Sequence, residues 1–378
     1  MKITGIICEY NPLHLGHYKQ IKLCKAEKDT ALVCLMSGNF VQRGAPAVID
    51  RMARAKAAVL CGADLVLELP VTGSLSSAEG FAKTGVDILA PICDSLCFGA
   101  ETDDGALIMN AAKLLLSEEF SGALRVHLDQ GLSFPAARQK ALEQLGADSK
   151  ILETPNNILA VEYCKAILQS EHKMLPMPIK REGSYHDQLP DRENPSATAV
   201  RTMMAQGADW EDFVPQAECF RNAKLHQLAW GEKAVLAKLR TMTDAEFEAL
   251  PYGSEGLWRK LMHNARSQAT LEDILTKTKS KRYTRTRLDR MVMCAFLGIT
   301  GEMLASPAPY TRILAFNDIG REILKQARNL GNYVNLGERM DDPWQALEDR
   351  CGDLYGLFAK EPEVPGRSNR DRVYYHKD

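Results

Sequence analysis

The sequence of 378 residues lacks the segments that mark exported and membrane proteins. Its N-terminus has no basic stretch followed by an apolar one, and no uninterrupted apolar run approaches the ~20 residues that a membrane-spanning helix needs. We therefore expect a cytoplasmic protein that has no contact with a membrane.

Cysteine patterns typical of zinc sites and disulfide scaffolds are also absent. The ten cysteines include no CxxC pair, and Cys93 and Cys97, the closest two, have no histidine near them to complete a zinc site. We therefore predict no metal-ligating residues in the chain and several buried free thiols in a reducing compartment. Four cysteines lie in apolar runs: Cys8, Cys34, Cys61 and Cys294.

An excess of positive charge is missing as well. The chain has 47 Lys and Arg residues against 49 Asp and Glu residues, which gives a net charge of −2. This balance excludes a globally basic nucleic-acid-binding protein, so any contact with RNA must come from a local patch. With 45% hydrophobic and 25% charged residues, the chain has the composition of a folded protein, and its length suffices for two domains.

The most informative stretch lies near the N-terminus, where two histidines follow an apolar run. Residues 3–8 read as a buried strand, and Asn11-Pro12 then breaks it, because a residue before proline is disfavoured in helical geometry. After Gly16 the apolar spacing becomes helical. His14 and His17 are therefore expected between the first strand and the N-terminus of a helix.

A helix N-terminus is a suitable site for phosphate oxygens, because its N–H groups are unpaired and it carries the positive end of the helix dipole. Gly16 would let the backbone approach the phosphates closely. His14 and His17 would donate hydrogen bonds to the charge that develops during nucleophilic displacement at phosphorus. The alternative is that both histidines are exposed polar residues on a loop.

The position of this motif resembles that in a known superfamily. A His-x-Gly-His sequence directly after the first parallel strand resembles the nucleotidyltransferases that form nucleoside-phosphate anhydrides from ATP or CTP. The longer string, from Glu9 to His17, is similar to that of the bacterial tRNA(Met) cytidine acetate ligases, although Leu13 and Leu15 replace the expected Phe and Asn. The resemblance implies that His14 and His17 are catalytic. It also implies that ATP binds along Ile7, Cys8, Glu9, Tyr10, Asn11, Pro12, Leu13, His14, Leu15, Gly16, His17, Tyr18, Lys19 and Gln20.

Residues 1–210 alternate apolar strands with amphipathic helices. Strands are expected at residues 30–36, 64–69, 96–98 and 173–179. This pattern predicts an α/β, Rossmann-like nucleotidyltransferase domain with a parallel sheet, whose ligands lie at the carboxyl ends of the strands. The loop at residues 37–44 follows the second strand; it is either a solvated turn or, as the resemblance implies, a wall on the substrate side.

Other positions match the family as nucleotide contacts. Gly99 follows the fourth strand, and the Pro-Asn-Asn element offers Asn156 rather than Asn157, although Asn156 is also a good helix N-cap. Arg181 matches an ATP-contacting arginine, with Lys180 as the alternative register. Residues 182–195 are expected to form a mobile flap. Ser196 and Arg201 then open a helix whose hydroxyl, N–H groups and guanidinium suit the β and γ phosphates of ATP.

Residues 211–378 are predicted to form an α-helical domain with a charged, loose tail from about residue 361. The stretch 277–290 holds seven basic residues and one acidic residue, which suits RNA phosphate, although such a face is often only a solvated surface. The family resemblance favours tRNA binding here. The candidate residues are Lys279, Lys281, Arg282, Arg285 and Arg287.

The resemblance covers nearly the whole chain and implies a specific reaction. An ATP-dependent ligase would activate acetate as acetyl-adenylate, with ATP as substrate and Mg²⁺ beside it. It would then transfer the acetyl group to the wobble cytidine of elongator tRNA(Met), forming N4-acetylcytidine, with no protein partner implied. Two alternatives are a small-molecule adenylyl- or cytidylyltransferase and a non-catalytic, nucleotide-gated RNA-binding protein.

Overall fold

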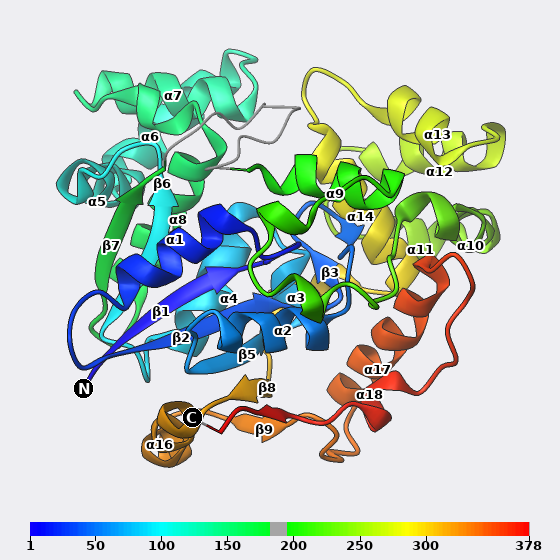
Figure 1. Cartoon of the computed structure of the whole chain (residues 1–378). Helices are drawn as coiled ribbons and strands as arrows, with labels where there is room; N and C mark the ends of the chain where they lie inside the picture. Colours follow the sequence, from blue (N-terminus) through cyan, green and yellow to red (C-terminus); the bar gives the residue numbers. More distant parts are fainter. Residues whose placement is uncertain (182–194, 378) are drawn as a thin grey trace.

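The computed structural model describes residues 1–181 and 195–377, and one mixed β-sheet forms its centre (Figure 1). The strand order is β10-β8-β5-β2-β1-β6-β7, with β9 paired to β8. The neighbouring strands β5, β2, β1, β6 and β7 are mutually parallel, and β8 is antiparallel to β5. The strands are β1 (Lys2–Cys8), β2 (Thr30–Ser37), β5 (Leu65–Leu69), β6 (Ser95–Ala100), β7 (Leu175–Lys180), β8 (Thr311–Phe316), β9 (Tyr333–Asn335) and β10 (Tyr374–Tyr375).

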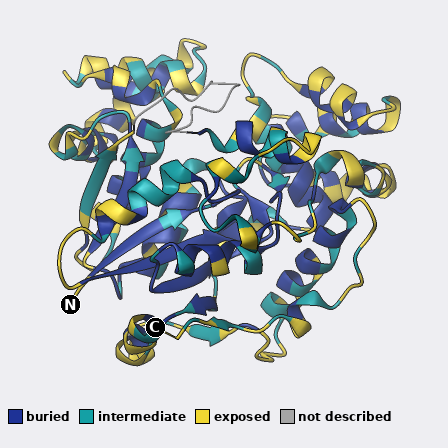
Figure 2. Ribbon diagram, in the orientation of Figure 1, coloured by how far each residue is buried: buried dark blue, intermediate teal, exposed yellow. Residues whose placement is uncertain are grey.

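Helices cover both faces of the sheet, which explains why its strands are apolar throughout. Every residue of β2 is buried. Leu32 and Cys34 pack with α1 (Leu15–Cys24) and α2 (Arg51–Leu60). Val33 and Leu35 pack on the opposite face with α4 (Ala78–Leu89) and α8 (Pro155–Gln169). Figure 2 shows the sheet as a buried layer, with the exposed residues on the outer helices.

The remaining helices form an outer layer beside the sheet and a second core. The helices α10, α12, α13, α14 and α17 enclose this second core, and Phe40 and Val71 from the sheet-containing part also belong to it. The bounds are α3 (Val71–Ser74), α5 (Gly105–Leu115), α6 (Glu118–Asp129), α7 (Phe134–Gln144), α9 (Ala197–Gln206), α10 (Leu228–Thr241), α11 (Asp244–Glu248), α12 (Leu257–Ser267), α13 (Leu271–Thr278), α14 (Arg285–Leu297), α15 (Gly301–Ala305), α16 (Asp318–Gln326), α17 (Pro343–Tyr355) and α18 (Arg367–Arg370).

The α/β fold with a parallel sheet is confirmed, but the part beyond residue 211 is not purely helical. Three of its segments, β8, β9 and β10, return to the main sheet. β8 pairs with β5 in an antiparallel register that places Phe316 opposite Leu65. The sequence pattern did not indicate this pairing, because β8 is a single short strand far along the chain from its partner. The division at residue 210 stays a prediction.

The tail beyond residue 361 was expected to be loose, and this expectation is wrong. Asp371 forms an ion pair with Arg51 at 3.4 Å, and Arg367 forms one with Asp50 at 3.0 Å. β10 then adds to β8 in parallel. The charges that suggested a solvated tail therefore attach it to α2, at the edge of the sheet.

The prediction of buried free thiols is confirmed for Cys8, Cys34, Cys61 and Cys294. The loop predicted at residues 37–44 contains the short strands β3 (Phe40–Val41) and β4 (Ala45–Pro46). In the described part of the chain, we find no helix with the length and apolar character to cross a membrane. The predicted flap falls almost wholly at residues 182–194, outside the described residues.

Candidate active site

Two hydrogen bonds lock the paired histidines at the start of α1. His14 is the N-cap residue, and its Nδ1 accepts from the Gly16 N–H at 3.1 Å. Nδ1 of His17 accepts from the His14 N–H at 3.3 Å, and the two rings stack with centroids 3.8 Å apart. Because each Nδ1 is an acceptor, a neutral ring carries its proton on Nε2. Each neutral ring therefore has one N–H donor, and that of His17 is shared with the Pro12 carbonyl.

Both histidines are held in the neutral form. Burial, with the guanidinium groups of Arg181 and Arg201 nearby, lowers the pKa of His14 from 6.5 to about 3. The pKa of His17 lies well below its usual range because of burial and the nearby His14, Arg181 and Arg201. A hydrogen bond from a ring N–H of His17 to the Pro12 carbonyl raises the pKa and only partly offsets these effects. The alternative of exposed loop residues is wrong for His14, which is 4% exposed.

Gly16 packs closely against the first histidine. A Cβ atom at this position would lie 3.0 Å from Cε1 and 3.2 Å from Nδ1 of His14. A side chain here would therefore press on the imidazole and require it to shift by a few tenths of an ångström. This agrees with the predicted close approach at the helix start, although the atom that comes close in the structure belongs to a histidine.

The residues predicted to bind the nucleotide lie together at the ends of β6 and β7. Asn156 Oδ1 accepts from Arg181 Nη1 at 3.3 Å. Gly99 leaves room for this arginine, since a Cβ atom at Gly99 would lie 3.0 Å from Arg181 Cγ. Successive residues point to opposite faces of a strand, and only Arg181 of the two candidates joins this network, which favours it over Lys180.

Glu101 organises this network and was not identified from the sequence. Its carboxylate accepts from Thr154 Oγ1 at 2.7 Å, from Asn156 Nδ2 at 2.8 Å and from the Asn157 N–H at 2.9 Å. Asn156 is not the N-cap of α8; Thr154 has that position and makes no side-chain cap, so Glu101 satisfies the helix N-terminus instead. The available signal was an acidic residue directly after a strand end.

The arginine and serine of α9 face the same loop from the other side. Ser196 is the N-cap of α9, and its Oγ accepts from the Ala199 N–H. Arg201 donates to the Asn11 carbonyl at 2.7 Å and to Thr198 Oγ1 at 3.0 Å. The positive charges of Arg181 and Arg201 both lower the pKa values of the two histidines, so both guanidinium groups lie within electrostatic reach of the imidazoles. Such a group of donors suits a polyphosphate.

The loop at residues 37–44 is a packed wall, not a solvated turn. The fully buried Arg54 donates to the carbonyls of Glu9 and Ser37 at 2.7 and 3.0 Å, and also to that of Gly38, which ties the ends of β1 and β2 together. Gly44 has φ +78°, and a Cβ atom there would collide with the backbone of α14. The family role of this loop, as a wall on the substrate side, stays a prediction.

Comparisons with known proteins agree with this geometry. Residues 1–367 match the family model of HIGH nucleotidyl transferases. The chain is 37% identical over 401 residues to the tRNA(Met) cytidine acetate ligase of Clostridium novyi (strain NT), covering 99% of this chain and 100% of that one. The chain belongs to the tRNA(Met) cytidine acetate ligase family. The enzyme of that name from Clostridium tetani (strain Massachusetts / E88) is 36% identical over 389 residues, covering 96% of each chain.

Solved structures support membership of the ligase family. A crystal structure of Thermotoga maritima TmcAL without ligand matches with a TM-score of 0.91 at 29% identity, and a second one, bound with alpha-thio ATP, matches with 0.89 at 28%. Both alignments cover 100% of both chains. The fold and chain order of the family are therefore present throughout.

The basic stretch of this family member is less free than its sequence suggested. Arg285 is paired with Glu272 at 2.7 Å and with Asp289 at 2.8 Å. Arg282 is paired with Glu255 at 2.8 Å, and Arg287 donates to the Tyr252 carbonyl and to Ser254. Lys279 and Lys281 are exposed, and no acidic partner accompanies them in the described part of the chain. The assignment of this stretch to tRNA stays a prediction.

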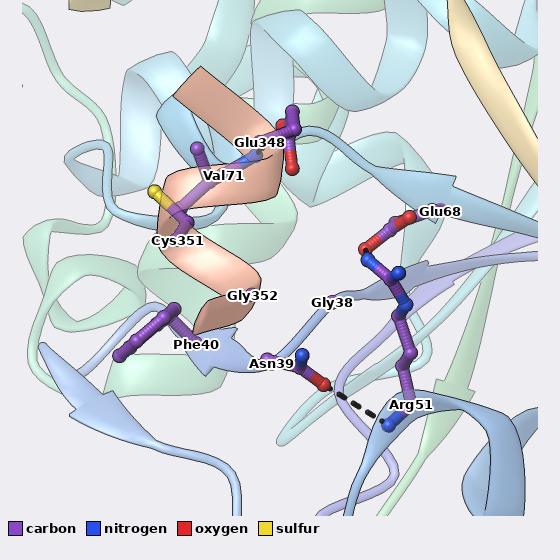
Figure 3. Close-up of a pocket in the computed structure, with 9 residues that line it drawn as sticks. All are labelled: Gly38, Asn39, Phe40, Arg51, Glu68, Val71, Glu348, Cys351 and Gly352. Atoms are coloured by element: carbon purple, nitrogen blue, oxygen red, sulfur yellow. Dashed lines mark hydrogen bonds and ion pairs between the residues drawn. The ribbon is translucent and has the colours of Figure 1, made fainter. Parts of the chain in front are cut away.

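A small cavity behind the wall is lined by buried charged side chains that pair with one another. Figure 3 shows Arg51, Glu68 and Glu348 among the residues around it. Glu68 pairs with Arg51 at 2.9 Å and with Arg312 at 2.8 Å, and Arg312 also pairs with Glu348 at 2.7 Å. These buried ion pairs connect β5 with β8 and α17, and their charges compensate one another.

Proposed function

We propose that this chain is an ATP-dependent ligase that activates acetate as acetyl-adenylate. The observation that carries the proposal is the pair of neutral imidazoles at the N-terminus of α1, with Arg181 and Arg201 beside them. Its support from outside the chain is the name of its relatives and the alpha-thio ATP in a related structure.

In the first step, the acetate carboxylate attacks the α-phosphate of ATP in line, and pyrophosphate leaves. Nε2–H donors of His14 and His17 would stabilise the charge that develops on the phosphate oxygens, since preorganised donors act most strongly in a site that excludes water. Arg201 and the N-terminus of α9 at Ser196 would hold the departing pyrophosphate. Gly99 and Asn156 would bind the nucleoside part, and Arg181 would contact the phosphates.

In the second step, the exocyclic amine of the wobble cytidine of elongator tRNA(Met) attacks the acetyl carbon, which yields N4-acetylcytidine and AMP. The base must leave its anticodon stack to reach the mixed anhydride. We assign adenylation to residues 1–210 and RNA contact to residues 211–378, with Lys279, Lys281, Arg282, Arg285 and Arg287 as candidate contacts. The reaction would take place in the cytoplasm.

Magnesium is predicted to accompany ATP, but residues 1–181 and 195–377 offer it no ready-made site. Among the residues that the structure describes, no three His, Cys, Asp or Glu side chains converge as a metal site. The phosphate region is lined by N–H and guanidinium donors, whereas Mg²⁺ prefers oxygen ligands. No step above depends on the ion.

Pyrophosphate release from ATP with a panel of small carboxylates, measured with and without tRNA, tests the proposal. We expect acetate-dependent release, and acetyl transfer when elongator tRNA(Met) is added. Release that needs a phosphorylated or nitrogenous small molecule in place of acetate would indicate a nucleotidyltransferase of small molecules. ATP binding without pyrophosphate release under any condition would indicate a nucleotide-gated RNA-binding protein.

A further inference from the structure

The proposed second step needs a proton acceptor, and the geometry excludes both histidines. The cytidine amine loses a proton when its nitrogen becomes an amide. In His14 and His17 the Nδ1 atoms accept backbone N–H groups, so Nε2 already carries the ring proton. A second proton would make a buried cation beside Arg181 and Arg201, which is unfavourable. The two imidazoles are therefore donors.

Two further carboxylates near the strand ends are engaged. Glu101 accepts from three donors, of Thr154, Asn156 and Asn157. Glu68 lies between two guanidinium groups, of Arg51 and Arg312, and these ion pairs lower its pKa against the effect of burial. Neither group has an oxygen in place to receive a proton from a substrate.

Glu9 differs from these carboxylates because one of its oxygens is unengaged. Its Oε1 accepts from the Gln42 N–H at 2.9 Å, and its Oε2 has no hydrogen-bond partner among residues 1–181 and 195–377. The side chain is half-buried, and Arg54 fixes its backbone carbonyl at 2.7 Å. The carboxylate is thus positioned by two contacts, yet keeps an oxygen available.

The place of Glu9 in the sheet puts it between the nucleotide and the wall. It follows β1, whose neighbours are β6 on one side and β2 on the other. The nucleotide residues gather at the ends of β6 and β7, and the wall follows β2, so a second substrate would approach from the wall. Glu9 contacts this wall through the Gln42 N–H. Burial lowers the pKa of the Arg201 guanidinium, and the negative charge of Glu9 partly offsets this effect.

We infer that Glu9 is the general base of acetyl transfer. The cytidine N4 atom attacks the acetyl carbonyl carbon and forms the C–N bond; the C–O bond to the phosphate breaks, and AMP leaves with that electron pair. One N4 proton moves to Glu9 Oε2 and then to solvent, so the base is regenerated. This inference rests on the proposed two-step reaction and adds the residue that completes its second step.

Glu9→Gln tests the assignment because it keeps the acceptor for the Gln42 N–H and removes the base. Hydroxylamine traps acetyl-adenylate as acetohydroxamate without general-base help, since its lone pair is not conjugated as that of cytosine N4 is. We expect Glu9→Gln to slow acetylation of tRNA roughly 10²- to 10⁴-fold more than it slows hydroxamate formation, since that is the usual contribution of a general base. Glu153→Gln, an exposed substitution of the same kind, should change neither rate.

Three outcomes would overturn the inference. Parental acetylation of tRNA by Glu9→Gln means that another group takes the proton. Loss of hydroxamate together with acetylation means that Glu9 serves the nucleotide. A loss explained by weaker tRNA binding, measured by filter binding, means that it contacts RNA. Failure of the proposed function is distinguishable, because the parent protein would then form no acetate-dependent hydroxamate.

Discussion

Replacing Glu101 with Gln should weaken ATP binding, because the hydrogen bonds around this carboxylate leave no solution for an amide. The three groups that face it, from Thr154, Asn156 and Asn157, are all donors. In the variant, the new NH₂ group facing the Asn156 amide would meet a donor. Turning Asn156 over relieves that clash but brings its NH₂ group against Arg181 Nη1, which is also a donor.

The size of the effect follows from the hydrogen bond that the variant cannot make. A hydrogen bond to a charged group contributes about 1.5–3 kcal/mol, which corresponds to roughly 10- to 150-fold in an equilibrium constant. Asn156 and Arg181 are partly exposed, so in the free protein the mispaired groups can turn to water. Nucleotide binding must restore their order, and the cost should therefore appear in the KM for ATP. Turnover should change little, because the histidines at the α-phosphate are not involved.

Initial rates of acetate-dependent pyrophosphate release over a range of ATP concentrations separate the two constants. Asp103→Asn removes the same charge two residues away at an exposed position and should leave KM unchanged. A KM for Glu101→Gln equal to that of the parent, or a loss confined to kcat, would refute the reasoning. An increase in KM alone distinguishes a role in ATP binding from a purely structural role, which has no reason to act on ATP affinity alone.

The paired histidines and the basic stretch allow four more measurements. His17→Ala removes one donor and should slow single-turnover adenylation roughly a hundredfold; a near-normal rate would remove His17 from the phosphate site. The pKa of His14 is 6.5 in ordinary surroundings and about 3 in the fold, so below that ordinary value the unfolded chain gains a proton that the folded chain does not. The melting temperature should therefore fall with decreasing pH more steeply for the parent than for His14→Gln, and equal slopes would contradict this. Lys279→Ala with Lys281→Ala should reduce the slope of log tRNA affinity against log salt by about 0.7 to 0.9 for each lysine that meets a phosphate, with adenylation unchanged. Arg285→Ala, which breaks ion pairs on α14, should affect thermal stability more than tRNA affinity, and the reverse result would return this arginine to the RNA contacts.

The parts of the fold that the sequence predicted depend on local signals. A wholly apolar run such as β2 indicates a strand buried on both faces, and Asn11-Pro12 ends a strand whatever surrounds it. The start of α1 also follows from neighbouring residues, since His14 and His17 bond to backbone groups within three positions. The position of the site was accessible for the same reason.

The parts that were missed depend on contacts between distant segments. The role of Glu101 becomes visible only in the folded chain, where α8 lies beside the end of β6. Its partner Asn156 is 55 residues further along the sequence. The charged tail was predicted to be solvated because no partner for its charges lies nearby in the sequence. Asp371, for example, pairs with Arg51 of α2, 320 residues away. A pattern read along one segment contains no information about which segment will lie beside it.

The hydrogen bonds that start α1 also determine what its histidines can do. Asp at position 14 would cap the helix as well as an imidazole does, because a cap needs only an acceptor for a free N–H group. Its remaining lone pairs and its charge would repel a phosphate. An imidazole accepts at Nδ1 and is thereby left with its proton on Nε2, so the same ring satisfies the helix and can donate to a ligand. Folding therefore requires only an acceptor at position 14, whereas phosphate chemistry requires a group that accepts on one side and donates on the other.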